Sequence, residues 1–428
     1  MKILVYQWKA YNGRDIEEGF KALGHEVFVF SEQESNATED PQFISKFRFY
    51  LRHLHQQLGK KPLDFVFSVD FFLGLSEACE QDGIRYVSWS CDAGLSSMYY
   101  PAAKNKCNYF FLFDKADYLE FKGKLENVYY LPLAASLDRI SAALGEEDFG
   151  TPPERFENEV SFVGTLYAKN QYDALYESFD EYLRGYLDAC LEAQLNISGG
   201  NILELLLTPE VLSHIVSRYE MKPSESQENF QQESIVPETL QSERFLPEHL
   251  AEDQASLGRF FVRNVLGYKA AREERLRILR ALGRCFPTTL YGSEAPPDYI
   301  LRSARYLKIE PTVDYWTELP ILYYRSKINL NLTIPNIASG VPLRVFDILM
   351  SGGFLLTNDR PELHELFYPE KELVIFDGIP DLISKIRYYL IHKEEREMIA
   401  KAGQKKVLEQ YDLKIRLQEI IQIMSNEA

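Results

Sequence analysis

The sequence predicts an α/β protein built from two successive units, each a parallel sheet covered by helices. Two observations support this prediction. Short apolar segments rich in β-branched and aromatic residues alternate with helical segments, as in βαβ units. The pattern stops at a polar segment with two prolines, residues 144–159, and starts again at residue 160. We therefore expect two Rossmann-like domains facing across a cleft, with ligands at the carboxyl ends of the strands.

The expected elements follow from the apolar pattern along the chain. In the first domain we expect a helix at 14–24 and strands at 2–6, 26–30, 64–69, 85–89, 109–113 and 128–132. In the second we expect helices at 271–283 and from 380 onward, and strands at 160–164, 288–292, 327–333, 354–357 and 373–376. The segment 217–253 mixes charges with prolines, which indicates an exposed insertion.

These elements define the expected domain boundaries. The first domain, on the acceptor side, covers 1–150, and the second covers 151–410 with a helical insertion at about 170–265. Residues 411–428 form a last helix, which we expect to pack back on the first domain.

Composition restricts the function classes. The 428 residues carry 47 Lys and Arg against 64 Asp and Glu, a net charge of −17, which argues against nucleic acid or an anionic membrane as partner. Five scattered cysteines form no CxxC or metal-ligand spacing, as in reduced thiols of a cytoplasmic protein. No apolar run approaches 18 residues, so we expect a soluble protein without membrane insertion.

The segment 340-GVPLRVFDILMSGGFLLTND-359 places an Arg and an Asp in an otherwise apolar run. It predicts a mostly buried helix from about Pro342 to Met350, ended by Ser-Gly-Gly and followed by a buried strand. Arg344 and Asp347 lie on one face, and a mutual ion pair is one interpretation. The other is a nucleotide site, because the helix N-terminus and Arg344 suit a diphosphate while Asp347 suits a ribose diol.

Several segments resemble a known family. "SKINLNLTIP", "GVPLRVFDILMSGGFLLTNDRPELHELF" and "KIRYYLIHKEEREMIAKAGQKKVLEQY" resemble the carboxy-terminal domain of GT-B glycosyltransferases of the CgeB-like spore-maturation group. "EVSFVGTLYAKN" resembles the opening of that domain. "ALGHEV", "GIRYVSWSCD" and "NVYYLPLAAS" are similar to the uncharacterised domain that commonly precedes it.

The resemblance implies roles for particular residues. Asp347 takes the place of the acid that binds the ribose, and Ser339 stands where related enzymes have a second Glu near the donor sugar. Backbone amides around Ala338–Gly340 are then expected to contact the donor. The phosphate element falls on Gly164, Thr165 and Lys169, and since Thr replaces an Arg, Arg344 and Lys169 would carry most of the positive charge. Val313 matches a loop whose backbone meets the base.

Carboxylates at strand ends are candidates for acid–base chemistry. Asp92 follows one predicted strand and Asp70 another, so either could take the proton of an acceptor in an inverting transfer, with Asp92 preferred. The alternative for each is a helix cap or a loop hydrogen bond. Asp114 and Asp117 form a DxxD pattern that we interpret as a capped, solvated turn.

The predicted function is metal-independent transfer of a sugar from a nucleotide-sugar donor, UDP-linked, to a glycan or protein acceptor. No metal and no cofactor are expected, because the sequence contains no DxD, HExxH or GxxxxGK[ST] motif. One alternative is a non-catalytic subunit that binds a nucleotide sugar or a partner enzyme. A nucleotide-sugar 2-epimerase on the same scaffold is less favoured, because few histidines lie in suitable loops.

Overall fold

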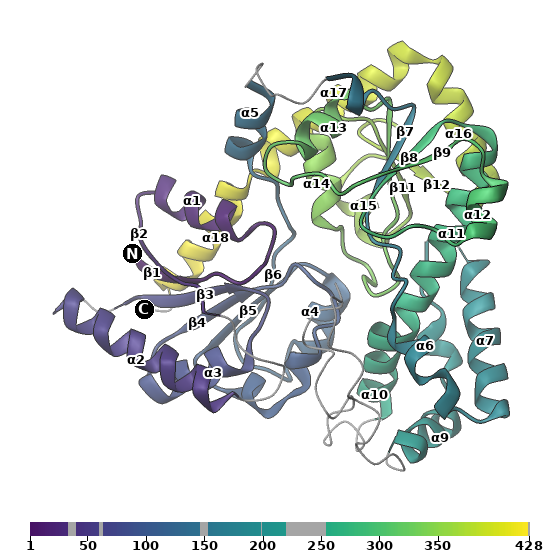
Figure 1. Ribbon diagram of the computed structural model, residues 1–428. Helices are drawn as coiled ribbons and strands as arrows, with labels where there is room; N and C mark the ends of the chain where they lie inside the picture. The colour runs from purple at the N-terminus through teal and green to yellow at the C-terminus, as the bar shows by residue number, and fades with distance from the viewer. Residues whose placement is uncertain (33–39, 60–62, 146–152, 198, 220–253, 427–428) are drawn as a thin grey trace. The chain divides into compact units, whose positions relative to one another are not determined.

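The computed structural model describes the chain except for residues 33–39, 60–62, 146–152, 198, 220–253 and 427–428 (Figure 1). The chain divides into two compact units, each discontinuous in sequence. Unit 1 comprises Met1–Leu131, Lys169–Glu192 and Ile202–Lys269, and unit 2 comprises Pro132–Ala168, Ala193–Asn201 and Ala270–Ala428. The predicted boundary at 150–151 and nearly all of the predicted insertion segment 217–253 lie outside the described residues.

Unit 1 contains a parallel six-stranded sheet in the order β2-β1-β3-β4-β5-β6. Its strands are β1 (Lys2–Tyr6), β2 (Glu26–Phe30), β3 (Phe65–Val69), β4 (Tyr86–Trp89), β5 (Asn108–Leu112) and β6 (Val128–Tyr130). All of them lie within or next to the ranges predicted from the sequence. The four inner strands are buried because helices cover both faces, whereas the edge strands β2 and β6 are mostly half-buried.

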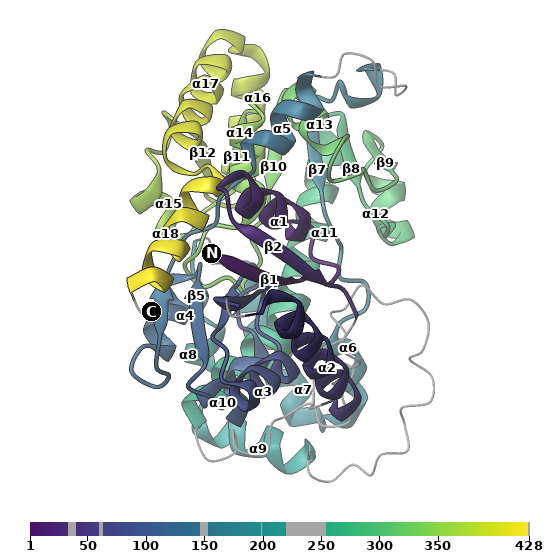
Figure 2. The ribbon, with the colours of Figure 1, turned by 90° about the vertical axis from the view of Figure 1, so that its left-hand side faces the viewer.

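Alternating side chains of these strands serve the two faces of the sheet. Phe65 and Phe67 contact Phe20 of α1 (Gly13–Ala22), with ring centroids 6.4 and 5.3 Å apart. Val66, between them, belongs to the core on the other side, against α2 (Pro41–Leu58) and α3 (Leu73–Asp82). Figure 2 shows α2 and α3 side by side on that face.

Unit 2 contains a second parallel six-stranded sheet in the order β12-β11-β10-β7-β8-β9. Its strands are β7 (Val160–Val163), β8 (Thr288–Tyr291), β9 (Leu307–Glu310), β10 (Ile328–Asn331), β11 (Leu355–Asn358) and β12 (Val374–Phe376). Five of these were predicted. The prediction missed β9, an edge strand in which apolar and charged residues alternate. Its residues are half-buried or exposed.

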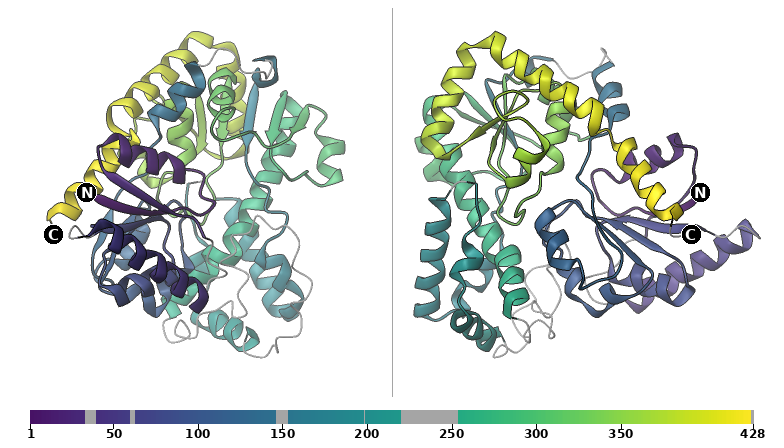
Figure 3. Two further views of the ribbon diagram at one scale, coloured as in Figure 1. Left: turned by 60° about the vertical axis from the view of Figure 1, so that its left-hand side comes forward. Right: turned by 180° about the vertical axis from the view of Figure 1, so that it is seen from behind.

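Helices from distant parts of the chain cover the unit 2 sheet. Apolar residues of α11 (Gly267–Cys285), α16 (Gly378–Ile391) and α17 (Lys393–Gln410) form one core with the strands. The pair α16 and α17 is drawn in yellow-green in Figure 3. The unit also contains α5 (Leu137–Gly145), α12 (Asp298–Ser303), α13 (Leu319–Arg325), α15 (Pro361–Leu366) and the predicted terminal helix α18 (Leu413–Asn426).

The helix predicted at 342–350 is confirmed as α14 (Leu343–Met350), with Pro342 as its N-cap residue. Val345 to Met350 are all buried, including Asp347. The helix ends at Ser351, and Gly352 follows with φ = +77°, a backbone conformation that glycine adopts without a Cβ penalty. At the other end of α14, the loop of residues 332–342 connects β10 (Ile328–Asn331) to the helix N-terminus.

The described part of the insertion consists of helices, drawn in teal in Figure 3. These are α6 (Gln171–Leu175), α7 (Glu181–Leu195), α8 (Leu203–Leu206), α9 (Pro209–Tyr219) and α10 (Gln254–Phe261). A π-helical turn, Val262–Leu266, joins α10 to α11. Most of the insertion belongs to unit 1 although its sequence lies between two strands of unit 2. Among the described helices, none has both the length and the apolar character that a membrane span needs.

Candidate functional site

Each sheet has a position where the strand order changes direction, and such positions bind ligands in open α/β sheets. In unit 2 the chain leaves β7 toward β8 and β9 on one side, and β10 toward β11 and β12 on the other. The carboxyl ends of β7 and β10 flank this position. Gly164 and Thr165 follow β7, and the loop that leads to α14 follows β10, so two predicted segments meet at the edge where a ligand is expected.

Arg344 in the first turn of α14 reaches the loop after β7. A Cβ added to Gly164 would lie 3.7 Å from Nη2 of Arg344 and 3.2 Å from the Phe162 ring. The guanidinium of Arg344 also hydrogen-bonds the side chain of Tyr323 on α13. Glycine at position 164 thus leaves room beside a guanidinium that sits near a helix N-terminus, an arrangement suited to an anion.

Arg275 of α11, which the sequence analysis did not identify, is a second guanidinium at this place. It is buried, donates to the carbonyl oxygens of Thr165 and Leu332, and lies 4.7 Å from the centroid of the Tyr167 ring. Burial lowers the pKa of Arg275, and the positive charge of Arg344 lowers it further. Two like charges close enough to repel each other are stabilised by an anion that binds to both.

Asp347 is held by partners other than Arg344. Its Oδ1 accepts a hydrogen bond of 2.5 Å from Nη2 of Arg139 on α5, in a buried ion pair, and Tyr315 also hydrogen-bonds it. The guanidinium of Arg139 lies 4.1 Å from the centroid of the Tyr315 ring. Burial raises the pKa of Asp347, while Arg139 opposes that shift. The interpretation of Arg344 and Asp347 as a mutual ion pair is wrong in its partner, because Arg139 forms the pair and Arg344 adds only a weaker electrostatic effect. A ribose would have to share the carboxylate with Arg139.

The remaining predicted donor residues of unit 2 lie in loops. Ser339 donates from Oγ to Oε1 of Glu362, at 2.7 Å, and its carbonyl accepts from the backbone of Glu362. Gly340 follows Ser339, in the loop before α14. Val313 is half-buried in a loop where the carboxylate of Asp314 accepts from the amides of Trp316 and Thr317. Side-chain acceptors order these two loops.

The loop after β7 already holds a carboxylate. Glu294 accepts hydrogen bonds from the backbone amides of Leu166, at 2.5 Å, and Ala168, at 3.2 Å. Tyr167 between them has φ = +52°. Successive amides around a left-handed residue form a concave anion-binding turn. Lys169, the next predicted phosphate ligand, is exposed and belongs to unit 1, whereas Gly164 and Thr165 belong to unit 2.

The order of strands in unit 1 changes direction between β1 and β3, and Asp70 follows β3. Asp70 is buried, with φ = +58°. Its Oδ1 accepts from the amides of Cys91, at 2.8 Å, and Asp92, at 3.2 Å. Burial, and then the charge of Asp92, raise the pKa of Asp70 well above its usual value. Asp70 thus fixes the turn that carries Asp92, which is itself exposed.

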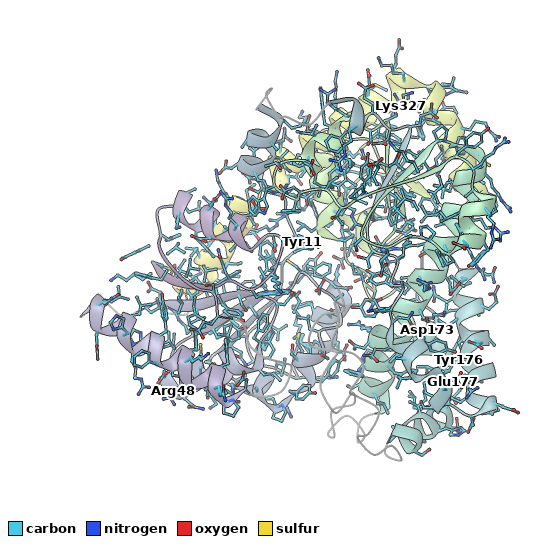
Figure 4. All side chains as sticks on the ribbon, in the orientation of Figure 1. Tyr11, Arg48, Asp173, Tyr176, Glu177 and Lys327 are labelled. Carbon is cyan, nitrogen blue, oxygen red and sulfur yellow. The ribbon has the colours of Figure 1, made fainter. Side chains whose placement is uncertain are left out.

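Asn12, the N-cap residue of α1, also reaches this edge, and the sequence analysis missed it. Asn12 is buried and donates from Nδ2 to Sγ of Cys91, at 3.1 Å. Tyr11, labelled in Figure 4, is 72% exposed. No motif marks Asn12, because its contact with Cys91, the residue before Asp92, arises only when β1, β3 and β4 pair.

The interpretation of Asp114 and Asp117 as a capped, solvated turn is half wrong. Asp114 does cap α4 (Lys115–Phe121), since its carboxylate accepts from the amide of Ala116. However, both side chains are buried, and Asp117 forms an ion pair with Arg263 of the π-helical turn. The pattern could not show this, because the partner lies in the insertion, far away in sequence.

Comparisons with known proteins give a family match for part of the chain and a fold for all of it. Residues 265–422, which include β8 to β12 and α14, match the model of a family described as glycosyl transferase-like. This region is similar to glycosyl transferase-like domains. No curated protein matches the chain in sequence. Among the described residues, no group of three or more His, Cys, Asp or Glu side chains is arranged to hold a metal ion.

Solved structures with little sequence identity share the fold. A glycosyltransferase from Rickettsia africae is 9% identical, with 99% of this chain and 98% of that chain covered and a TM-score of 0.56. Sucrose-phosphate synthase from Thermosynechococcus elongatus is 9% identical over 100% and 98%, with a TM-score of 0.51. Anabaena HepE in complex with UDP and glucose is 11% identical over 100% of both chains, with a TM-score of 0.51. The fold is that of GT-B proteins, with two Rossmann-like domains.

Proposed function

We propose that the protein is a glycosyltransferase that moves a sugar from a UDP-linked donor to a glycan or protein acceptor. The observation that carries the proposal is the pair of neighbouring guanidiniums, Arg275 and Arg344, at the carboxyl edge of the sheet in a region similar to glycosyl transferase-like domains. Their repulsion favours a bound anion. The amides at the N-terminus of α14 add further positive charge.

In the proposed reaction an acceptor hydroxyl attacks the anomeric carbon of the donor sugar. The bond from that carbon to the phosphate oxygen breaks, and its electron pair leaves with the diphosphate, whose growing charge Arg344 and α14 stabilise. Asp92 is the proposed base that takes the hydroxyl proton, because the residue is exposed at the end of β4, while partial desolvation of its carboxyl raises the pKa of Asp92. Asp70 is the less favoured base, since its carboxylate is buried and accepts two amide hydrogen bonds.

The proposal includes the site residues, cofactor requirement and location expected from the sequence. The donor is contacted by Gly164, Thr165, Lys169, Val313, Ser339 and Gly340, and its ribose by Asp347. No metal or other cofactor takes part in the proposed reaction. The protein is proposed to be cytoplasmic and CgeB-like. UDP is the preferred nucleotide because a structure of the same fold, HepE, is in complex with UDP and glucose.

A second candidate function is a non-catalytic subunit that binds a nucleotide sugar. Two observations favour it. Asp347 is already held by Arg139, and Ser339, standing where related enzymes have an acid, is engaged with Glu362. A 2-epimerase has no comparable support in the structure.

The deciding experiment is a screen of nucleotide sugars against the purified chain by thermal shift, with release of free nucleotide followed in parallel. Each donor is measured with EDTA and with added Mg²⁺. The proposal expects one donor, UDP-linked, to stabilise the protein and release UDP slowly, equally with EDTA. Stabilisation without release, with candidate acceptors present, would support the binding subunit instead. Release only with Mg²⁺ would refute metal independence.

The site assignment is tested by Arg344→Ala. Loss of a guanidinium that contacts the diphosphate should weaken nucleotide binding more than tenfold, about 1.4 kcal/mol. Arg305→Ala is the matched control, because Arg305 is an exposed arginine of the same unit. Binding is measured by calorimetry with UDP. Equal affinity of the folded R344A variant and the control would contradict the placement of the diphosphate at α14.

A further inference from the structure

The turn that carries Asp92 is anchored at a second point, two residues further along. Gly94 has φ = +70°, and its amide donates to Oδ2 of Asp117 on α4, at 3.1 Å. A Cβ added to Gly94 would lie 2.6 Å from Cδ of Arg263 and 2.9 Å from its Cβ. The backbone of the turn therefore lies directly on the aliphatic part of Arg263, and no larger residue fits.

Arg263 and Asp117 form an ion pair with side chains only 3% and 6% exposed. Burial raises the pKa of Asp117 to about 6 even though Arg263 opposes the shift. Burial alone would lower the pKa of Arg263, but the charge of Asp117 and its neighbours raises it. Both groups are thus charged at neutral pH. One carboxylate serves two donors, since Oδ1 accepts from Arg263 and Oδ2 from Gly94.

A second ion pair joins the same elements next to the first. Arg259 of α10 pairs with Glu120 of α4, at 2.8 Å, and Glu120 also accepts from the hydroxyl of Tyr99, at 2.8 Å. The ring of Tyr99 meets Phe260 of α10 edge to face. Tyr99 lies in the short helix Ser96–Tyr99 that follows the Asp92 turn. Contacts with the insertion therefore fix this chain segment on both sides of residue 95.

A buried ion pair such as Arg263–Asp117 is expected to add little to the free energy of unfolding. Desolvation usually cancels the attraction of a buried ion pair, and apolar side chains of similar volume are often as stable. Arg263 also lies in a π-helical turn, a rare conformation that is frequent at functional sites. What the pair does provide is a carboxylate oxygen at one fixed position, which is the acceptor for Gly94.

We propose that Arg263 and Asp117 are positioning residues that fix the turn of Asp92, and that the insertion supplies this support. The inference rests on the proposed function, in which Asp92 takes the acceptor proton. It assigns to the insertion, through residues about 170 positions after Asp92 in the sequence, a part in acceptor activation rather than in donor binding.

Two double variants separate the effect of the hydrogen bond from Gly94 to Asp117, here called the tether, from the effect of the ion pair. D117N/R263M and D117L/R263M both remove the buried charges, and methionine keeps much of the aliphatic volume under Gly94. Only the asparagine of D117N/R263M still offers an oxygen to the Gly94 amide. The two double variants therefore differ from each other in the acceptor for the Gly94 amide, and both are compared with the wild type. Tyr176, labelled in Figure 4, donates a hydrogen bond to Asp188 within the insertion. The variant Tyr176→Phe removes this bond and so controls for loosening of the insertion itself.

The expected result is a difference between the two double variants in transfer alone. D117L/R263M should show a kcat about 10- to 100-fold below that of D117N/R263M, as a misplaced catalytic group does. The KM for the donor and the thermal shift by UDP should agree within about twofold, because kcat and KM report different steps. Y176F should match the wild type. Equal kcat values in the two folded doubles would overturn the inference.

Hydrogen exchange gives a readout that does not need activity. The Gly94 amide should exchange slowly in the wild type and in D117N/R263M, and about tenfold or more faster in D117L/R263M, since it has lost its acceptor. Equal exchange of peptides spanning residues 90–96 in all three proteins overturns the inference on its own. If the wild type transfers no sugar from any donor, the proposed function fails, while the exchange experiment still decides whether the tether exists.

Discussion

Asp70 and Asp92 carry the same functional group and both have a pKa raised by desolvation, but the two residues differ in exposure. Asp70 is buried at φ = +58° and receives two amide hydrogen bonds, whereas Asp92 is exposed one turn away. A base must reach its proton, so access favours Asp92, and the hydrogen bonds make Asp70 a support for it. The sequence could place both at strand ends, but burial of one and exposure of the other depend on packing.

This division of roles predicts different results for the same substitution. Asp92→Asn should reduce kcat for sugar transfer by about 10²-fold or more, because an amide cannot take the proton. Asp70→Asn should keep most of the activity, since the Oδ1 atom of asparagine still accepts from the two amides. Steady-state transfer assays with the donor found in the screen measure both. Loss of activity in D70N with D92N unaffected would exchange the two roles.

Asp70 also predicts a pH dependence of stability. Its pKa is raised in the folded protein, so the folded state keeps a proton that the unfolded state releases near pH 4. The free energy of unfolding should therefore fall as pH rises from about 4 through the folded pKa. D70N should lack this loss, and so gain stability relative to the wild type at higher pH. Denaturant titrations at several pH values measure the difference.

Arg139 offers a test of the buried pair with Asp347. Replacement by Ala leaves a carboxylate buried without its cation, and should lower the free energy of unfolding by about 3–5 kcal/mol. Arg14→Ala removes an exposed helix pair with Glu18 and should cost less than about 0.5 kcal/mol. Chemical denaturation measures both. Similar small losses would show that Asp347 is not dependent on Arg139.

Sequence reasoning identified Arg344 and Asp347 because opposite charges in an apolar run are rare. It could not identify Arg139 and Arg275 as their neighbours, or Glu294 as the acceptor in the loop after β7. Each lies in a segment of ordinary composition, and only the pairing of distant strands brings it to the site. A buried charge is visible in sequence, whereas its partner is not.

The helix α14 and the strand β9 show what apolar pattern can and cannot predict. Six consecutive buried residues between a proline and a glycine pair made α14 predictable. Edge strand β9 is shielded little by neighbours, so its sequence, LKIE, has no continuous apolar run. The strength of the signal followed the degree of burial.

Helix packing around α14 gives a prediction with two glycines. In α17, a Cβ on Gly403 would overlap the carbonyl oxygen of Glu372 and lie 2.8 Å from Leu349 of α14. Gly403→Ala should therefore destabilise the protein by about 1–3 kcal/mol, despite the better helix propensity of alanine. In α7, nothing lies within 4 Å of a Cβ on Gly185, and Gly185→Ala should stabilise by about 0.5–1 kcal/mol. Thermal unfolding of both variants measures the signs, and the same sign for both would contradict this packing.

The two sheets have the same number of strands but different orders. In unit 1 the order changes direction between β1 and β3, and in unit 2 between β7 and β10. Alternating strand and helix signals predicted two parallel sheets, but they contain no information about which strands are neighbours. Likewise, sequence order placed the insertion between strands of unit 2, whereas most of it folds with unit 1. Local patterns determine elements, and long-range packing determines where they go.

The carboxylate of Glu294 in the loop after β7 has a kinetic consequence under the proposed function. The amides of Leu166 and Ala168 already have an anionic partner that belongs to the chain itself. A phosphate group that needs those amides must exchange places with the side chain, and the side chain is tethered close by when the phosphate departs. Such a built-in competitor weakens binding of donor and product alike, and it speeds the departure of the nucleotide after each turnover.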